Sequence, residues 1–123
     1  MKNLLSIGLG GFIGSVLRYI CSISCSKILI SDFPIGTFFV NILGCFLIGL
    51  LINSSIINLS NYYLNELLII GLLGGFTTFS TFGLESYNLI KNGFTAMSIV
   101  YIIASIVFGL IAIYIGSKLN GDF

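Results

Sequence analysis

The sequence predicts an all-α integral membrane protein with four transmembrane helices. Hydrophobic residues make up 57% of the chain and charged residues only 7%, whereas about a quarter of a typical globular domain is charged. The mean hydropathy is +1.14. A hydrocarbon core of about 30 Å needs about 20 apolar residues per helix. We therefore expect one four-helix transmembrane domain over residues 1–123.

The distribution of charge separates the four spans. Between Lys2 and Lys27 the only charge is Arg18, and the stretch 34–64 carries no charge. Glu66 and Glu85 enclose eighteen uncharged residues, and Lys91 and Lys118 enclose twenty-six. We expect helices at 4–30, 35–57, 63–90 and 95–117. The stretches SDFP at 31–34, NSSIINLSN at 53–61 and KNGF at 91–94 contain the residues that break helices.

The third span contains an unusual stretch, GGFTTFSTF at 74–82. Two glycines and four hydroxyl residues weaken a helix, so we predict a break near 74–81, where Gly74 and Gly75 permit conformations closed to other residues. Carbonyls freed at membrane depth need protein, water or an ion as partner. Broken transporter helices present such carbonyls to cations and helix N-termini to anions. Phe76, Phe79 and Phe82 recur at intervals of three, and their spacing fits either a packing ridge or a conduction site.

Polar residues recur along one face of three spans. These stripes are Gly11, Ser15, Arg18 and Ser22 in the first span, Thr37, Asn41 and Gly44 in the second, and Tyr101, Ser105 and Gly109 in the fourth. Helix packing explains any one stripe, but three stripes with a permanently charged Arg18 favour a polar path. Hydrogen-bond donors, a cation and the positive edges of phenylalanine rings favour an anion in that path. Glu85 argues against an anion unless it lies near the mouth, is paired or is protonated.

The lysines near the span ends do not favour one orientation of the chain in the membrane. Lys2 and Lys118 lie on one side of a four-span arrangement, and Lys27 and Lys91 lie on the other. Because lysines and arginines near span ends set topology, the chain is open to insertion in both orientations. An antiparallel homodimer with its two-fold axis in the membrane plane is then the natural closed assembly. The alternative is that the insertion machinery imposes one orientation.

Four stretches of the chain carry a resemblance to a known family. They are GGFIGSVLRY at 10–19, GTFFVNILGCFLIG at 36–49, GGFTTFSTF at 74–82 followed by Glu85, and YIIASIVFG at 101–109. In this order, and over nearly the whole chain, the sequence resembles the CrcB/Fluc family of fluoride ion channels. The resemblance implies a multi-pass protein of the inner (plasma) membrane that exports fluoride passively from the cytoplasm. It also implies a dual-topology antiparallel homodimer with two fluoride pores and a central structural sodium ion.

The resemblance also assigns roles to residues of this sequence. The main-chain carbonyls of Gly74 and Thr77 would hold the sodium ion. The residues of the fluoride pore would be Asn41, Thr78, Phe79, Ser80, Phe82, Tyr101 and Ser105, with Phe76 left as packing. Arg18 and Glu85 would be charges of the vestibule or the polar track. Gly109 stands where some members carry serine, which leaves the far end of the track open.

Two other functional classes fit a small membrane protein of this kind. A dual-topology multidrug or cation exporter shares the size and the balanced charge, but proton-coupled export needs a deep acidic residue, and the first span supplies Arg18 instead. A scaffold would leave the broken third helix unexplained. An enzyme is disfavoured, because there is no histidine and no nucleophile paired with a base. Cys21, Cys25 and Cys45 are interpreted as small buried hydrophobes.

The expected partners follow from this interpretation. They are fluoride, a second copy of the chain and the lipid bilayer. Sodium is the only expected cofactor. We expect no organic cofactor and no nucleic acid.

Overall fold

The computed structural model describes residues 2–28, 32–52, 54 and 62–119. Its elements are α1 (Lys2–Ile28), α2 (Ile35–Ile52), α3 (Tyr62–Asn65), η1 (Glu66–Leu73), α4 (Gly74–Phe76), α5 (Phe79–Lys91) and α6 (Thr95–Leu119). The third span consists of α3, η1, α4 and α5. Four helical stretches are long and apolar enough to cross a membrane, so the predicted all-α class with four spans is confirmed. The expected helix ends at 29–30, 53 and 55–57 lie outside the described residues.

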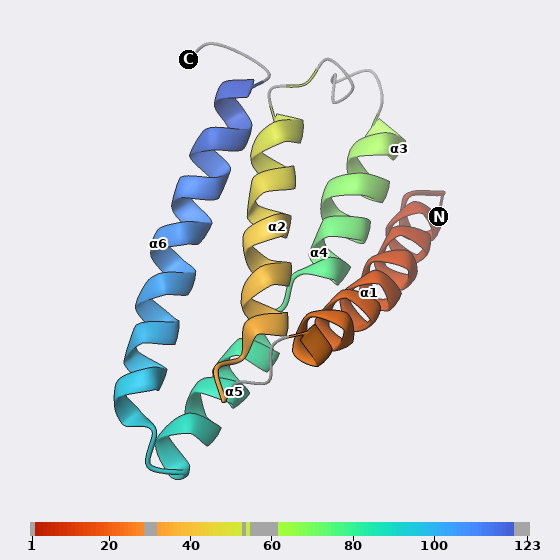
Figure 1. Cartoon of the computed structure of the whole chain (residues 1–123). Coiled ribbons are helices and arrows are strands. Elements are labelled where there is room, and N and C mark those ends of the chain that lie inside the picture. The colour runs from red at the N-terminus through yellow and green to blue at the C-terminus, as the bar shows by residue number, and fades with distance from the viewer. Residues whose placement is uncertain (1, 29–31, 53, 55–61, 120–123) are drawn as a thin grey trace.

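Successive spans run in opposite directions (Figure 1). In this view α1 and the third span descend, whereas α2 and α6 ascend, so α6 ends at the end of the bundle where α1 begins. α2 lies between α6 and the third span and packs against both. α1 packs against the third span up to α4. The middle of the third span is therefore held between α1 and α2.

Glycine pairs bring α1 and the third span into backbone contact. Gly10 and Gly14 are four residues apart on α1, as are Gly71 and Gly75 on the third span. A Cβ atom added at Gly71 would lie 2.9 Å from the Cα atom of Gly10, and one added at Gly75 would lie 2.6 Å from the Gly11 carbonyl oxygen. Small residues at this spacing let membrane helices approach closely enough for strong van der Waals contact. The contact anchors the third span immediately before its break.

α2 and α6 are parallel and pack in register. The Sγ atom of Cys45 lies 3.4 Å from the place where a Cβ atom at Gly109 would stand. One turn further along both helices, a Cβ atom at Gly49 would collide with the backbone of Ile113. Gly116 would collide with α2 in the same way if it carried a side chain. This register determines which side chains of α2 and α6 lie at the same level.

The break in the third span lies at Thr77 and Thr78, within the predicted range. Thr77 has φ −79° and ψ 160°, and Thr78 has φ −151° and ψ 125°, so both residues are extended. The conformations that Gly74 and Gly75 permit are not used at the break. Gly74 is helical, with φ −64° and ψ −35°, and Gly75 lies within α4. The break instead forms at two β-branched residues whose hydroxyl groups can bond to nearby backbone.

The KNGF stretch ends α5 with a Schellman turn. The N–H of Gly93 donates to the carbonyl of Ile90 at 3.0 Å, and the N–H of Phe94 donates to the carbonyl of Leu89 at 2.8 Å. This pair of bonds defines the motif and requires a left-handed residue just after the helix. Gly93 supplies that conformation with φ 87°. The predicted breaker between the third and fourth spans is thus confirmed.

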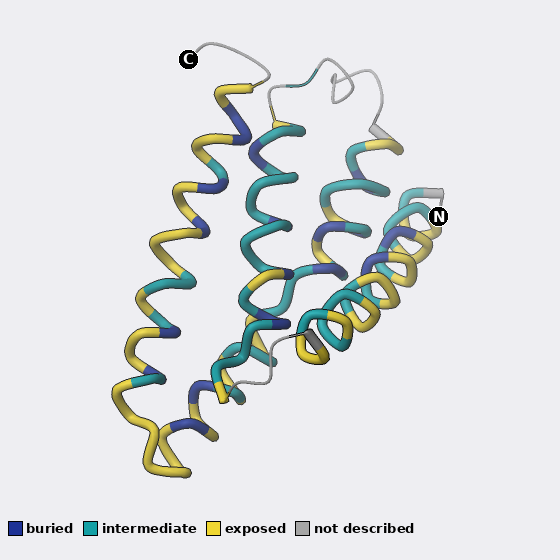
Figure 2. The backbone as a smooth tube through the Cα atoms, in the orientation of Figure 1, coloured by how far each residue is buried: buried dark blue, intermediate teal, exposed yellow. Residues whose placement is uncertain are grey.

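Buried residues lie where the helices meet, and exposed residues lie on the outer faces (Figure 2). On α6, Gly109 and Ala112 are buried, whereas Phe108, Leu110 and Ile111 are exposed. A large apolar surface of this kind suits lipid or another protein better than water. The distribution of burial is therefore that of a bundle embedded in a membrane.

Candidate functional site

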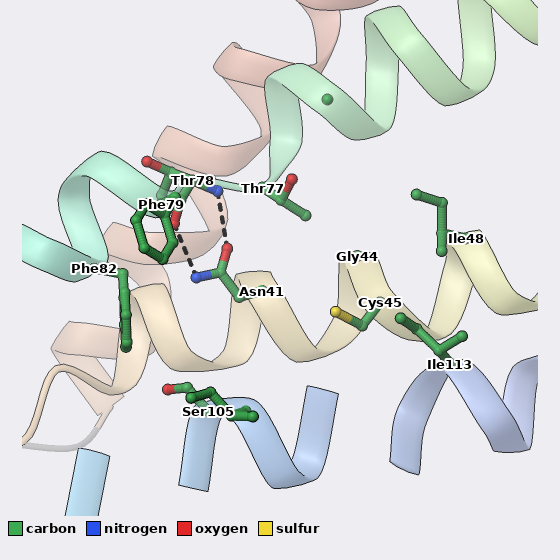
Figure 3. A pocket seen from close by; sticks show the side chains of 12 residues that line it. Asn41, Gly44, Cys45, Ile48, Thr77, Thr78, Phe79, Phe82, Ser105 and Ile113 are labelled. Carbon is green, nitrogen blue, oxygen red and sulfur yellow. Dashed lines mark hydrogen bonds between the residues drawn. The ribbon is translucent and has the colours of Figure 1, made fainter. Parts of the chain in front are cut away.

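Asn41 on α2 bridges the break in the third span. Its Nδ2–H donates to the carbonyl oxygen of Thr78 at 3.0 Å, and its Oδ1 accepts the N–H of Thr78 at 2.9 Å (Figure 3). The side-chain amide replaces hydrogen bonds that the extended backbone cannot make within a helix, as backbone groups at membrane depth require. Nδ2 carries two N–H bonds, and Thr78 uses one of them. The other has no acceptor among the described residues and is available to a ligand.

Thr78 also caps α5. Its Oγ1 accepts the N–H of Thr81 at 3.2 Å and donates to Thr81 Oγ1 at 3.1 Å. It also lies 3.3 Å from Ser80 Oγ. Threonine is a favourable N-cap because its hydroxyl oxygen satisfies one of the N–H groups that a helix start leaves unpaired. The break therefore places a helix N-terminus, with its partial positive charge, in the middle of a span.

The carbonyl groups of Gly74 and Thr77 lose their usual helical partners at the break. In a continuous helix they would accept the N–H groups of Thr78 and Thr81, four residues later. The N–H of Thr78 donates to Asn41 Oδ1 instead, and the N–H of Thr81 donates to Thr78 Oγ1. Two main-chain oxygens with cation-binding chemistry thus lie in one short stretch. They belong to the two residues that the resemblance assigns to sodium.

A pocket of about 440 Å³ lies beside the break (Figure 3). Its lining comes from α2, the third span and α6. The lining residues are Asn41, Gly44, Cys45, Ile48, Gly74, Thr77, Thr78, Phe79, Phe82, Ser105, Ile106 and Ile113. The structure thus brings together most of the residues predicted for the pore and for sodium. Ser80 and Tyr101 contact lining residues but do not line the pocket themselves.

Ser105 offers the pocket an unused hydroxyl group. Its Oγ is buried and has no hydrogen-bond partner among the described residues. Helical serines often donate to the carbonyl one turn earlier, as Ser86 does to Phe82 at 2.8 Å. A buried polar atom without a partner is uncommon and costs stability. The Ser105 hydroxyl is therefore placed to donate to an ion or a water molecule in the pocket.

Phe79 and Phe82 begin α5 and contact each other, with ring centroids 5.6 Å apart. The ring of Phe82 also lies 5.1 Å from the ring of Tyr101. Phe79 is 83% exposed and projects from the protomer, whereas Phe76 is 4% exposed and packs inside. The edge of an aromatic ring carries partial positive charge. The structure therefore separates Phe76 from the two pocket rings and places Tyr101 where it can support Phe82.

Glu85 is held by two hydroxyl groups. Thr37 Oγ1 donates to Glu85 Oε1 at 2.8 Å, and Tyr101 Oη donates to Glu85 Oε2 at 2.9 Å. Thr37 is 3% exposed and Tyr101 is fully buried, so this network joins α2, α5 and α6 inside the protomer. Of the interpretations left open for Glu85, the structure shows a carboxyl group paired with hydrogen-bond donors. Its side chain does not line the pocket at the break.

Arg18 lines a second pocket, of about 360 Å³. The other lining residues are Ser15, Tyr19, Ser22, Thr37, Val40, Thr78 and Thr81. The prediction that Ser15, Arg18 and Ser22 share one face is thus confirmed. Thr78 lines both pockets, so the break stands between a pocket with a cationic side chain and the pocket with the phenylalanines. A fixed positive charge in a cavity raises the local concentration of anions.

Sequence reasoning missed two residues of this site. Cys45 was expected to be a buried hydrophobe, but it lines the pocket at the break. Its position one turn after Asn41 could have indicated this, because residues four apart share a helix face. Thr81 lines the second pocket and bonds to the cap of α5. Its place in the GGFTTFSTF stretch was the available signal.

Comparisons with known proteins show the family of this chain. The family model described as CrcB-like protein, Camphor Resistance (CrcB), matches residues 5–117. A protein named fluoride-specific ion channel FluC, from Phocaeicola vulgatus, is 50% identical over 117 residues, which cover 94% of this chain and 96% of the relative. A protein of the same name from Ruminiclostridium cellulolyticum is 46% identical over 121 residues, covering 97% and 92% of the two chains. With its four spans, the chain is a multi-pass membrane protein that belongs to the CrcB family.

Proposed function

We propose that this chain forms a fluoride-selective channel through which fluoride leaves the cytoplasm passively. The observation that carries the proposal is the pocket at the break, which Asn41, Ser105 and Phe82 line together. Among the described residues, the second Asn41 N–H and the Ser105 hydroxyl have no hydrogen-bond partner. These groups suit an anion. The relatives named fluoride-specific ion channels support fluoride as that anion.

The pocket meets the main physical difficulty of conducting fluoride. Fluoride is a small anion that holds its water tightly, so a pore must replace that water with closely placed donors. Asn41 and Ser105 supply such donors, and the rings of Phe79 and Phe82 supply positive edges. Chloride is larger, and pore diameter with the lining groups determines which ion passes. Glu85 does not line this pocket, and its carboxyl oxygens accept hydrogen bonds from Thr37 and Tyr101.

The pocket around Arg18 acts as the vestibule in this mechanism. Its cationic side chain and its hydroxyl groups attract anions from water to the break. Thr78, shared by the two pockets, marks the point of passage between them. The guanidinium of Arg18 stays charged at any physiological pH. We therefore expect Arg18 to affect the rate of entry more than the choice of ion.

The functional unit we propose is an antiparallel homodimer with two pores. Phe79 and Gly74 are exposed on the protomer although both line the pocket. In a single copy the freed carbonyls of Gly74 and Thr77 would face lipid without a partner, which membrane proteins avoid. A second copy related by a two-fold axis in the membrane plane would cover both breaks at once.

The same dimer would hold one structural sodium ion. The residues fit this role, because Gly74 and Thr77 present carbonyls whose helical donors are engaged elsewhere. Main-chain carbonyls at broken helices are established ligands for sodium in transporters. The ion would neutralise the carbonyl dipoles of both copies and join the two breaks.

Efflux from liposomes tests fluoride conduction directly. Liposomes that contain the purified protein and potassium fluoride should lose fluoride rapidly when valinomycin lets potassium follow, while chloride-loaded liposomes should retain their salt. Protein-free liposomes with valinomycin are the control for leakage. Equal efflux of fluoride and chloride would contradict the proposed selectivity. Proton-driven export of organic cations without fluoride efflux would instead favour the exporter.

A further inference from the structure

The side chains of α2 and α6 meet level by level beside the break. The successive levels are Thr37 with Tyr101, Asn41 with Ser105, and Cys45 with Gly109. The first pair shares the carboxylate of Glu85, and the second pair lines the pocket. The third pair continues the same register one turn further along both helices. The levels therefore form one continuous stripe of facing residues.

The third level differs from the others because α6 offers no side chain there. Gly109 is buried, and a Cβ atom built on it would stand 3.4 Å from Cys45 Sγ, in ordinary van der Waals contact. Cys45 lines the pocket and forms no disulfide. In Figure 3 its sulfur points along α2 towards Asn41 and Ser105. Among the described residues of α2 and α6, the thiol is therefore the only polar side-chain group at this level.

We propose that the Cys45 thiol lines the anion path as a donor, in the place of a hydroxyl that Gly109 cannot supply. The inference rests on the proposed fluoride conduction. A second observation supports it, since Ser105 Oγ one level away is buried without a partner in the same pocket. The lining thus contains the Ser105 hydroxyl, a donor without a partner among the described residues. A thiol is a small group with a weak S–H donor, so it can face an anion without adding negative charge.

Substitutions across the third level separate a donor from a space-filling group. Four variants are compared with the parent for fluoride efflux per reconstituted protein. They are Cys45→Ser, Cys45→Ala, Cys45→Ala with Gly109→Ser, and Cys45→Ala with Gly109→Ala. The last two restore volume on the facing helix, but only the serine restores a donor. Removing the Cys45 sulfur makes room at Gly109, because, outside the local backbone of α6, that sulfur is the only described atom within 4 Å of a Cβ atom there.

We expect Cys45→Ser to conduct at the parent rate and Cys45→Ala to conduct about threefold more slowly, the effect of one weak hydrogen bond on a rate. Adding Gly109→Ser should restore the rate, and adding Gly109→Ala should not. The melting temperature of each variant in detergent shows whether packing changed. Parent-like efflux from Cys45→Ala, or equal rescue by alanine and serine, overturns the inference. A parent that releases no fluoride overturns the proposed function instead.

Thiol modification provides a second measurement that needs no substitution at Cys45. In a Cys21→Ser, Cys25→Ser background, methyl methanethiosulfonate should convert Cys45 to a methyl disulfide, with loss of methanesulfinate and of the thiol proton. The added group fills the lining and removes the donor, so efflux should stop and should return after dithiothreitol. The same background with Cys45→Ala should be insensitive. Confirmed modification of Cys45, by mass, with unchanged efflux contradicts a place in the path.

Discussion

Two hydrogen bonds join the side-chain amide of Asn41 to the peptide of Thr78, one from Nδ2–H to the carbonyl at 3.0 Å and one from N–H to Oδ1 at 2.9 Å. They make α2 responsible for the conformation of the break in the third span. Thr78 also caps α5 and lines both pockets. The break, the cap and the pockets therefore all depend on the side chain of Asn41.

Replacing Asn41 by aspartate should stop most fluoride flux. Asn41→Asp keeps an oxygen for the N–H of Thr78 but removes the donor and adds negative charge to the pocket. We expect fluoride efflux from liposomes to fall by about tenfold or more, because an anion path cannot tolerate a like charge. Asn88→Asp, on an exposed position of α5, is the matched control and should conduct normally. Equal efflux from both variants would remove Asn41 from the pore.

The two pocket phenylalanines should be needed for flux but not for assembly. Phe79→Ile and Phe82→Ile keep apolar bulk and remove the positive ring edge. Each should reduce fluoride efflux strongly while gel filtration still shows the parent's oligomeric state. Phe12→Ile on the exposed side of α1 is the control, since this ring is 69% exposed and lines neither pocket. If the double variant conducts like the parent, both rings serve packing alone.

The four spans could be predicted from sequence because composition and charge spacing act over whole helices. The range of the break could also be predicted, since hydroxyl residues and glycines cluster in one short stretch. The residues that actually unwind could not. Gly74 and Gly75 are helical. Gly75 packs against Gly11 of α1, and Asn41 of α2 satisfies the peptide of the extended Thr78. Both contacts connect residues far apart in the chain.

Other parts of the site also depend on packing between helices and could not be predicted from the sequence. The partners of Glu85 come from α2 and α6, so they depend on how three helices pack. The π-helical turns at Glu66–Leu73 have the sequence ELLIIGLL, which has no distinctive signature. Such turns often accompany functional sites, and here only the short α4 separates them from the break. By contrast, the shared helix face of Ser15 and Arg18 could be predicted, because residues three or four apart in a helix lie on the same face.

The glycine contact between α1 and the third span should be sensitive to a single methyl group. A Cβ atom at Gly14 would collide with the backbone of Leu72, whereas one at Gly8 would meet nothing within 4 Å. Both glycines lie in α1, so Gly8→Ala is a matched control for helix propensity. We expect Gly14→Ala to lower stability by about 1–3 kcal/mol or more through overpacking, measured as a lower melting temperature. Equal melting temperatures for the two variants would contradict the close contact.

Dual topology should be visible by labelling at the α5–α6 turn. Asn92 is exposed at this turn, so Asn92→Cys in a cysteine-free background should react with an impermeant maleimide from both sides of the membrane. Adding Thr95→Lys and Ala96→Lys should confine the label to one side, because lysines near span ends set orientation. Copies in one orientation cannot form the antiparallel dimer, so efflux should also fall. Glutamines at the same two positions are the control. Labelling from one side only, before lysines are added, would contradict dual insertion.

Gly74 should matter for the dimer although it has room within the protomer. A Cβ atom there would meet only the Ile69 carbonyl oxygen among the described residues, at 3.7 Å, outside the helix's own local backbone. The residue is helical, so a Cβ atom at this position causes no collision inside one copy. In the proposed dimer, however, the carbonyl of Gly74 faces the two-fold axis and the sodium ion, and a branched side chain would stand between the copies.

We therefore expect Gly74→Val to weaken the dimer and stop flux, whereas Gly83→Val, at an exposed helical glycine with nothing within 4 Å, should do neither. Exchanging sodium for N-methylglucamine should lower the melting temperature of the parent dimer by mass action. It should have little effect on the Gly74→Val protein, because the carbonyls that hold the ion are no longer brought together. A parent dimer insensitive to sodium, with normal flux from Gly74→Val, would show that the freed carbonyls are satisfied without a cation.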